Sequence, residues 1–393
     1  MNRTPAPGAN LAALRDHNAA LVLALLRDAG PDGASRAELA DRTGLTPQAV
    51  SKITGRLRVA GLAAEAGRRA STGGKPATAL RLMPEAAHAI GVHLERDALT
   101  VTLVDLAGAE AATCTSPLDL GAGAEAVLEA VAAQVARVRA GAGGSLLGVL
   151  GAGVALPGPL DHRTGVLQRV TGLPRWDGFP LRDALAERLG MPVVVDKDTN
   201  AAALGLVLRG CVGAAGSFAY LHLGTGLGAG LVLGGEVHRG ARTGAGEFGH
   251  QVLLLDGPPC RCGNRGCIEA LCLDAVGRGD TAEAARLLGT GAANLVRLLD
   301  IDLVLLGGGV LLKDAAAYAA GVREVLGGAP PVAVVPAGER TVVEGAAELV
   351  LASLFGRGGR DRHRALEGAG LAGPPGLAVP PGVTAPSPGT ARP

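Results

Sequence analysis

The sequence predicts a protein of the α/β class, in which an N-terminal winged helix-turn-helix precedes a two-lobed domain of the actin-like (ribonuclease H-like) ATPase type. Two observations lead to this prediction. Near the start of the chain, two helical patterns flank a tight glycine turn, and a basic hairpin pattern follows them. Farther on, three strands, a helix and a fourth strand follow one another, which is how an actin-like lobe begins. With 393 residues, the chain can form two or three hydrophobic cores.

The composition restricts the class of protein. The formal net charge is +1, so any binding of nucleic acid must depend on a local basic region. No apolar run reaches the roughly 18 residues of a membrane helix, and the first ten residues lack the apolar core of a signal peptide. We therefore expect a cytoplasmic protein whose 6 cysteines are reduced and free to bind metal.

The first two helices are predicted from spacing and capping. Residues 11–29 carry leucines at helical intervals, after a flexible start at residues 1–10. Ser35 and Glu38 have the spacing of a capping box, in which each side chain bonds the backbone N–H of the other residue. They predict a second helix over residues 36–43, which Gly44 ends.

A third helix is predicted over residues 48–60, because Thr46 and Pro47 form a favourable helix start. Its inward face is expected to bury Val50, Ile53, Leu57 and Val59. Its outward face carries our candidates for contacts with base edges and phosphates: Gln48, Ser51, Lys52 and Arg56.

A β-hairpin is predicted within residues 62–82, and together with the three helices it would complete a DNA-binding domain over residues 11–82. The hairpin carries Arg68, Arg69 and Lys75, which are placed to contact phosphates or the minor groove. Residues 1–82 contain twelve Lys and Arg against six Asp and Glu, whereas the remainder is slightly acidic. A helical interaction domain with a solvated charged face is the alternative; the charge segregation favours DNA binding.

The second domain is expected over residues 85–355, with one lobe at about 85–210, another at about 215–335 and a final helix at about 341–355. The predicted strands are 89–94, 99–106, 111–116, 146–156, 192–195, 217–223 and 301–306, and the predicted helices are 124–139, 199–208, 283–299 and 315–326. Residues 357–393 are rich in Gly, Pro, Ala and Arg and are expected to be disordered.

A metal site is predicted in the segment GEFGHQVLLLDGPPCRCGNRGCIE, residues 246–269. One imidazole and three thiolates would form a closed tetrahedral shell that suits one structural Zn²⁺ per chain. The predicted ligands are His250, Cys260, Cys262 and Cys267. The alternative is a loop of unrelated reduced thiols, but three of the 6 cysteines lie within eight residues, next to Gly and Arg.

The elements GEFGH and CRCGNRGCIE resemble the zinc signature of the ROK family, which comprises repressors, open reading frames and sugar kinases. The resemblance implies that Glu247, His250 and Glu269 also hold the hydroxyl groups of a sugar. It places Asp198 where ROK kinases have the catalytic base. The glycine-rich run 224–230 is similar to the family's second phosphate-binding turn, and the N-terminal segment resembles the winged helix of ROK repressors.

The sequence departs from the kinase pattern at three places. Lys197 and Gly172 stand where the family usually has Asn, and His93–Asp97 replaces the glycine-rich first phosphate element. The carboxylates of this run would repel a polyphosphate, so we expect poor ATP binding and no kinase activity, with Asp198 a vestigial base. We also expect the Lys197 ammonium to favour the ionised form of Asp198.

The combined features predict a sugar-responsive, DNA-binding regulator of transcription in carbohydrate metabolism, most simply a repressor. It would bind a palindrome-like operator as a homodimer or a dimer of dimers, although the segment after Cys272 is short for a dimerisation region. The sugar would contact Asp198, Glu247, His250 and Glu269. One alternative is a sugar kinase with an unusual first phosphate element; another is a regulator that has lost sugar sensing.

Overall fold

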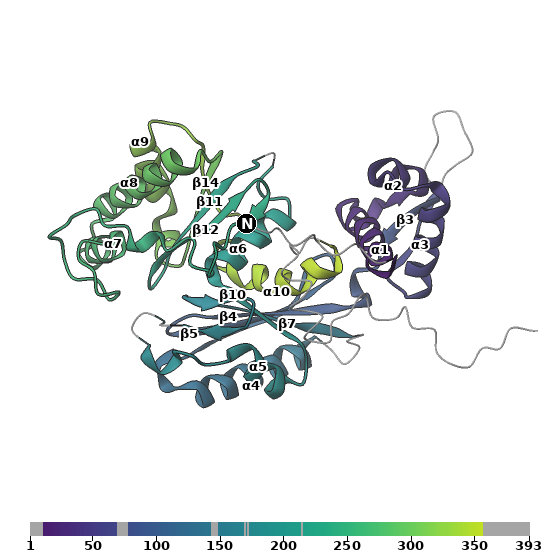
Figure 1. Ribbon diagram of the computed structural model, residues 1–393, viewed down its shortest axis with the longest axis horizontal. Coiled ribbons are helices and arrows are strands. Elements are labelled where there is room, and N and C mark those ends of the chain that lie inside the picture. Colours follow the sequence, from purple (N-terminus) through teal and green to yellow (C-terminus); the bar gives the residue numbers. More distant parts are fainter. Residues whose placement is uncertain are drawn as a thin grey trace, which may run out of the picture. The chain divides into compact units, whose positions relative to one another are not determined.

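The computed structural model divides the chain into two units between Leu82 and Met83 (Figure 1). It describes residues 11–68, 78–142, 148–168, 170, 173–213 and 215–356. Residues 1–10 and 357–393, Arg69, Lys75 and Gly172 lie outside the described residues, as does the side chain of Arg68. None of the described helices combines the length and the apolar character needed to cross a lipid bilayer.

The first unit contains three helices and a small antiparallel sheet. The helices are α1 (Leu11–Asp28), α2 (Arg36–Thr43) and α3 (Pro47–Val59), and the strands are β1 (Ala34–Ser35), β2 (Ala63–Arg68) and β3 (Thr78–Leu82), in the order β1-β3-β2. The predicted capping box is present, because Ser35 Oγ accepts from Glu38 N at 3.2 Å and Glu38 Oε2 accepts from Ser35 N at 2.7 Å. Gly44 ends α2 in the left-handed conformation, so α2 and α3 are joined by a tight turn.

Helix α3 buries one face and exposes the other. Val50, Ile53 and Leu57 are buried as predicted, but the prediction for Val59 is wrong, because its exposed fraction is 91%. Val59 is the last residue of α3 and lies about 200° around the helix from Leu57, on the side away from the core. The opposite face exposes Gln48, Ser51 and Lys52 and half-exposes Arg56.

The second unit has two lobes, each built on a five-stranded sheet. In lobe 1 the strand order is β10-β7-β4-β5-β6. The strands are β4 (His88–Leu94), β5 (Ala98–Asp105), β6 (Glu110–Pro117), β7 (Val149–Leu156) and β10 (Val193–Lys197). Strands β4, β5 and β6 are antiparallel, whereas β7 and β10 run parallel to β4. Helices α4 (Ala124–Gly141) and α5 (Leu181–Leu189) lie together below this sheet in Figure 1.

Lobe 2 repeats this topology. Its strand order is β13-β12-β11-β14-β15, with three antiparallel strands followed by two parallel ones. The strands are β11 (Phe218–Leu223), β12 (Leu227–Leu233), β13 (Glu236–Val237), β14 (Leu303–Gly307) and β15 (Val332–Val334). The helices α7 (Ile268–Gly277), α8 (Thr281–Leu299) and α9 (Ala315–Leu326) pack on one face. The duplicated sheet is the layout that we expected of an actin-like fold.

The sequence missed some local structure. Helices α5 and α7 were not predicted, and the glycine-rich run 224–230 is mostly strand, since β12 already begins at Leu227. The short strands β8 (Leu160–Asp161) and β9 (Val166–Leu167) form a separate hairpin.

Two helices, α6 (Asp198–Leu208) and α10 (Thr341–Leu354), lie between the lobes and cross each other closely. A Cβ on Gly205 would lie 2.8 Å from the Cα of Gly345, and one on Gly345 would collide with the carbonyl oxygen of Ala201. A Cβ on Gly153 of β7 would meet the backbone of α10, and one on Gly230 of β12 would meet that of α6. Each central helix therefore packs on one sheet, and glycines allow the close approach.

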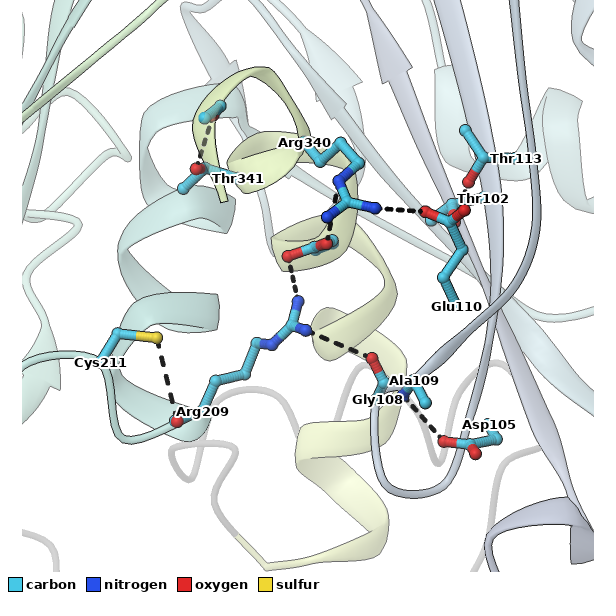
Figure 2. A network of polar contacts seen from close by, with 12 residues as sticks. Thr102, Asp105, Gly108, Ala109, Glu110, Thr113, Arg209, Cys211, Arg340 and Thr341 are labelled. Carbon is cyan, nitrogen blue, oxygen red and sulfur yellow. Dashed lines mark hydrogen bonds and ion pairs between the residues drawn. The ribbon is translucent and has the colours of Figure 1, made fainter. Parts of the chain in front are cut away.

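An ion-pair network ties these helices to lobe 1 at the end of α6 that is far from Asp198 (Figure 2). Arg209 binds Glu344 of α10 and donates to the carbonyl oxygen of Gly108 at 3.4 Å. Arg340 lies 3.1 Å from Glu110 of β6. A movement of α6 at its Asp198 end therefore requires a change in the contacts at its Arg209 end.

Candidate functional site

The segment from His250 to Cys267 forms a compact loop with its four predicted ligands turned inward, and we call it the zinc loop. It doubles back on itself, with bridges between Val252 and Cys267 and between Pro259 and Arg265. Gly266 has a φ of 65°, and a Cβ there would collide with the backbone of Leu254. This position therefore requires glycine for both reasons.

The four ligand atoms fit a tetrahedral zinc ion. Zn–S bonds of about 2.3 Å and a Zn–N bond of about 2.0 Å place ligand atoms about 3.6–3.8 Å apart. Cys262 Sγ lies 3.7 Å from Cys267 Sγ, and Cys260 Sγ lies 3.7 Å from His250 Nδ1. All four atoms are within 4.8 Å of one another. Burial, followed by the neighbouring Cys262 and Cys260, raises the pKa of the Cys267 thiol to about 12, so a cation is needed to hold its thiolate form.

The predicted sugar-binding residues line one cavity between the lobes. These residues are Asp198, Glu247, His250 and Glu269. Asp198 comes from the start of α6, Glu247 and His250 come from the entry to the zinc loop, and Glu269 comes from the first turn of α7. His250 turns Nδ1 to the thiol of Cys260, and its Nε2 lies 4.0 Å from Glu247 Oε2, so one ring can serve both the metal and the cavity.

Lys197 pairs with Glu247, not with Asp198. Its Nζ lies 2.7 Å from Glu247 Oε1 and donates to the carbonyl oxygen of Ala245 at 2.7 Å, and the side chain is 3% exposed. The methylene groups of Lys197 pack against Gly158, in space that a Cβ at that position would need. One carboxylate expected to face a sugar is therefore already engaged by a cation of the chain.

The prediction that Lys197 favours the ionised form of Asp198 is confirmed in direction, but burial outweighs its effect on the pKa. Burial raises the pKa of Asp198, and the lowering by Lys197 is smaller than those by His222 and by the Thr199 N–H, which Asp198 accepts at 2.6 Å. Lys197 has little influence because its ammonium points at Glu247.

Two buried histidines follow one another on this side of the cavity, with His222 next to Asp198 and His93 next to His222. Burial lowers the pKa of His222, and burial followed by His222 lowers the pKa of His93 to about 3. Tyr220 Oη and His222 Nδ1 are 2.9 Å apart and fix the ring. Asp198 and His222 influence each other, because His222 lowers the pKa of Asp198 and Asp198 partly offsets the effect of burial on His222.

The β4–β5 turn, residues 95–97, forms one side of the cavity. Glu95 and Arg96 line the cavity, whereas Asp97 is exposed outside it. Burial raises the pKa of Glu95 to about 7, and the nearby Asp97, Asp198 and Glu339 raise it further. The negative charge predicted for this side is therefore reduced, because Glu95 is only partly ionised near neutral pH and Asp97 lies outside the cavity.

Comparison with known proteins decides the family. A family model described as ROK family matches residues 89–279, which include the zinc loop and the four cavity residues. A ROK hexokinase from Thermus thermophilus is 34% identical in sequence, with 68% of this chain and 98% of the hexokinase covered and a TM-score of 0.55. The chain belongs to the ROK family.

Several relatives of this ROK chain are regulators. The DNA-binding transcriptional dual regulator NagC of Escherichia coli is 30% identical over 68% of the chain, and the xylose repressor of Caldicellulosiruptor bescii is 29% identical over 60%. The alignments span 64% and 59% of these two relatives. A solved ROK transcriptional regulator, a homologue of the E. coli MLC protein, has a TM-score of 0.72 and covers 87% of this chain and 97% of its own; at 22% identity it shows the fold alone.

Several cavity residues of this ROK chain were not predicted from the sequence as site residues, and Arg96, His222 and Arg261 are the basic side chains among them. They lie on the β4–β5 turn, on β11 and in the zinc loop, far apart in the sequence. Signals were available for Arg261, which lies between two predicted zinc ligands, and for Arg96, which lies within the run His93–Asp97. His222 joins the cavity only through the packing of distant segments.

Proposed function

We propose that this ROK protein is a sugar-responsive, DNA-binding regulator of transcription, acting as a repressor, and that it is not a kinase. The observation that carries the proposal is the combination of an exposed polar helix face in the first unit with a cleft whose nucleotide side presents Glu95. The relatives named as repressors support the same function. The solved regulator supports only the fold, and its match to 87% of the chain is longer than the second unit alone.

The first unit would be a winged helix-turn-helix that reads DNA with α3. Gln48, Ser51, Lys52 and Arg56 occupy one face of this helix, with the tight Gly44 turn before it and the β2–β3 hairpin after it. An exposed helix of this kind fits the major groove, where amide and basic side chains bond base edges and phosphates. Arg68, Arg69 and Lys75 of the hairpin would add contacts to phosphates or the minor groove.

The cleft would bind the sugar, and the zinc loop would stabilise one wall of the cleft. Four residues, Asp198, Glu247, His250 and Glu269, would accept or donate hydrogen bonds to hydroxyl groups, and a structural zinc on His250, Cys260, Cys262 and Cys267 would fix His250 and Glu269. When bound, the metal supplies a rigid crosslink of the loop. Sugar can alter DNA affinity only if it binds two conformations unequally, and the α6–α10 crossing gives the lobes a shared hinge on which to move.

Selection of bound DNA from a random pool, followed by titration of the full chain onto the selected duplex with and without a sugar panel, tests this function. We expect specific binding, a palindrome-like site and a change of affinity with one class of sugar. Arg56→Ala and Lys52→Ala should weaken binding across sequences, whereas Gln48→Ala should relax the sequence preference at one position. Failure to retain any duplex would contradict the proposal.

A sugar kinase is the second candidate, and one observation favours it. Asp198 lies at the kinase base position, and its raised pKa suits a group that accepts a proton near neutral pH. Detectable ADP formation from ATP with any hexose would establish this activity; we expect none, since the run His93–Asp97 lacks the glycines of a first phosphate element.

A further inference from the structure

A second cavity lies in the second unit, at the end of α6 that is far from Asp198. Its volume is about 390 Å³, which is within the range of sites that bind small molecules. Its wall comes from residues 205–211 at the end of α6, from the turn before α10 and from the first turns of α10. Among the described residues, this cavity and the cleft cavity share no lining residue.

Two arginines bring positive charge to the second cavity (Figure 2). Arg209 binds Glu344 through Nη1 and the carbonyl oxygen of Gly108 through Nη2, so its Nε–H has no partner in the described part of the chain. Arg340 binds Glu110 through Nη1, and its Nε lies 3.7 Å from Glu344, which leaves Nη2 without a partner among the described residues. Because a guanidinium group has five N–H donors, both arginines can bind a further acceptor.

The negative charge of this cavity is already engaged. The side chain of Glu344 is 8% exposed, with Oε2 bound to Arg209 and Oε1 turned to Arg340. Burial raises the pKa of the Cys211 thiol, so this lining residue stays uncharged near neutral pH. The lining therefore presents two cationic groups against one buried carboxylate.

The remaining lining is largely apolar. Leu206, Pro336 and Ala337 contribute carbon surface, and Gly205 and Gly345 contribute only backbone. Such a surface is covered favourably by an apolar group, whereas a bare inorganic ion would leave it in contact with water. The cavity thus combines unused guanidinium donors with an apolar wall.

We propose that this cavity is a second binding site of the protein, for a small organic anion that combines a carboxylate or phosphate group with an apolar part. The anionic group binds the guanidinium groups of Arg209 and Arg340, and the apolar part packs on Leu206, Pro336 and Ala337. Guanidinium groups suit this role because they bind carboxylate and phosphate oxygens in a bidentate manner. The site goes beyond the proposed function and does not depend on sugar sensing.

A purely structural role of Arg340 is the alternative, because this arginine already pairs with two carboxylates. Arg278 provides the matched control. Its side chain is 51% exposed, against 55% for Arg340, and it also pairs with two carboxylates, those of Asp274 and Glu283. Within the described ranges it belongs to neither cavity lining. A structural role would make Arg340→Gln and Arg278→Gln behave alike.

Titration of the full chain, followed by NMR of the probe molecules, tests the inference. The probes are benzoate, phenyl phosphate, benzamide and inorganic phosphate. Benzamide has the shape of benzoate without its charge, and inorganic phosphate lacks the ring of phenyl phosphate. We expect benzoate to bind about fivefold or more tightly than benzamide, or phenyl phosphate to exceed inorganic phosphate by that factor, with an affinity that weakens as salt is added. The tighter of benzoate and phenyl phosphate identifies the preferred anionic group.

Three variants locate the binding. Arg340→Gln should remove the preference for benzoate over benzamide, whereas Arg278→Gln should retain it. Ala337→Trp reduces the space in the cavity without removing a charge, so it should weaken the binding of benzoate and phenyl phosphate alike. Melting curves show whether each variant is folded, and a bound anion should raise the melting temperature of the unmodified protein.

Four results would overturn the proposal. They are the absence of binding by all four probes, benzamide and inorganic phosphate binding as tightly as their counterparts, equal losses of affinity in Arg340→Gln and Arg278→Gln, and full affinity of a folded Ala337→Trp for the anionic probes. None of them bears on sugar sensing, which the sugar panel tests separately.

Discussion

The two sides of the cleft differ in what they present to a ligand. The zinc-loop side carries an ordered set of groups, with His250 shared between the thiol cluster and the cavity and with Glu269 held by a backbone N–H. The β4–β5 side presents Glu95 and Arg96 on a short turn without glycine. Polyphosphate transfer needs both sides, whereas carbohydrate binding needs mainly the first. On the proposed function, the first side would bind carbohydrate and the second would no longer support phosphate transfer.

The largest effect should come from disrupting the zinc-loop side. Cys260→Ser removes one of the four proposed zinc ligands, so we expect loss of most of the bound zinc and a decrease of about 3 kcal/mol or more in the free energy of unfolding, because structural zinc binding contributes directly to folding. Metal analysis and denaturant unfolding measure the two quantities. Cys211→Ser is the control, since Cys211 is exposed and lies outside the cluster. Unchanged zinc content in Cys260→Ser would show that the loop does not use this thiol.

The next largest effect should come from the helices that join the two sides. Gly345→Ala would place a methyl group against the carbonyl oxygen of Ala201 in α6, and overpacking of this kind costs about 1–3 kcal/mol. Gly277→Ala is the control in the same unit, since nothing lies within 4 Å of a Cβ there. Thermal unfolding should show a clear loss of stability for Gly345→Ala alone. Similar stability of the two variants would mean that α6 and α10 are not closely packed.

The sequence was sufficient to predict local features of the fold, but not the contacts between distant segments. Ser35 with Glu38 and the bounds of α9 were predictable because capping and helical spacing are local. Helices α5 and α7 were missed because alanine and leucine are so common in this chain that amphipathic spacing is hard to recognise. The choice of Glu247 as the partner of Lys197 depends on the packing of distant segments, and spacing along the chain contains no information about it.

A smaller effect is expected from the charge on the β4–β5 side. The pKa of Glu95 is about 7 in the folded protein, above its value in the unfolded chain, so the folded state binds more protons between these values. The contribution of Glu95 to stability is therefore greatest at low pH and is lost as the pH rises through about 7. Glu95→Gln should increase the melting temperature above that pH by a few degrees at most and change it little near pH 4.

Asp97→Asn provides the comparison for this titration. It removes the largest charge effect on Glu95, so the pH window should move to lower values without disappearing. Melting curves recorded across the window distinguish the two variants. If the melting temperatures of Glu95→Gln and of the unmodified protein change in parallel with pH, the pKa of Glu95 is the same in the folded and the unfolded protein.

The smallest effect on stability, with the opposite sign, is expected in the first unit. Gly55 lies within α3, and a Cβ there would meet nothing within 4 Å. Gly55→Ala should therefore stabilise the helix by about 0.5–1 kcal/mol. Gly55 shares the exposed face of Ser51 and Lys52, so the same change should weaken DNA binding if this face enters the groove. Greater stability with unaltered DNA affinity would move the contact surface elsewhere.

The central claim is that this ROK fold uses its cleft to control DNA binding and not to transfer phosphate. Fluorescence anisotropy of the full chain on its selected duplex, with and without a carbohydrate that calorimetry shows to bind, tests it most directly. The account predicts a change in DNA affinity of about fivefold or more on saturation with that carbohydrate. Identical affinity with the cleft empty and with the cleft saturated would contradict it.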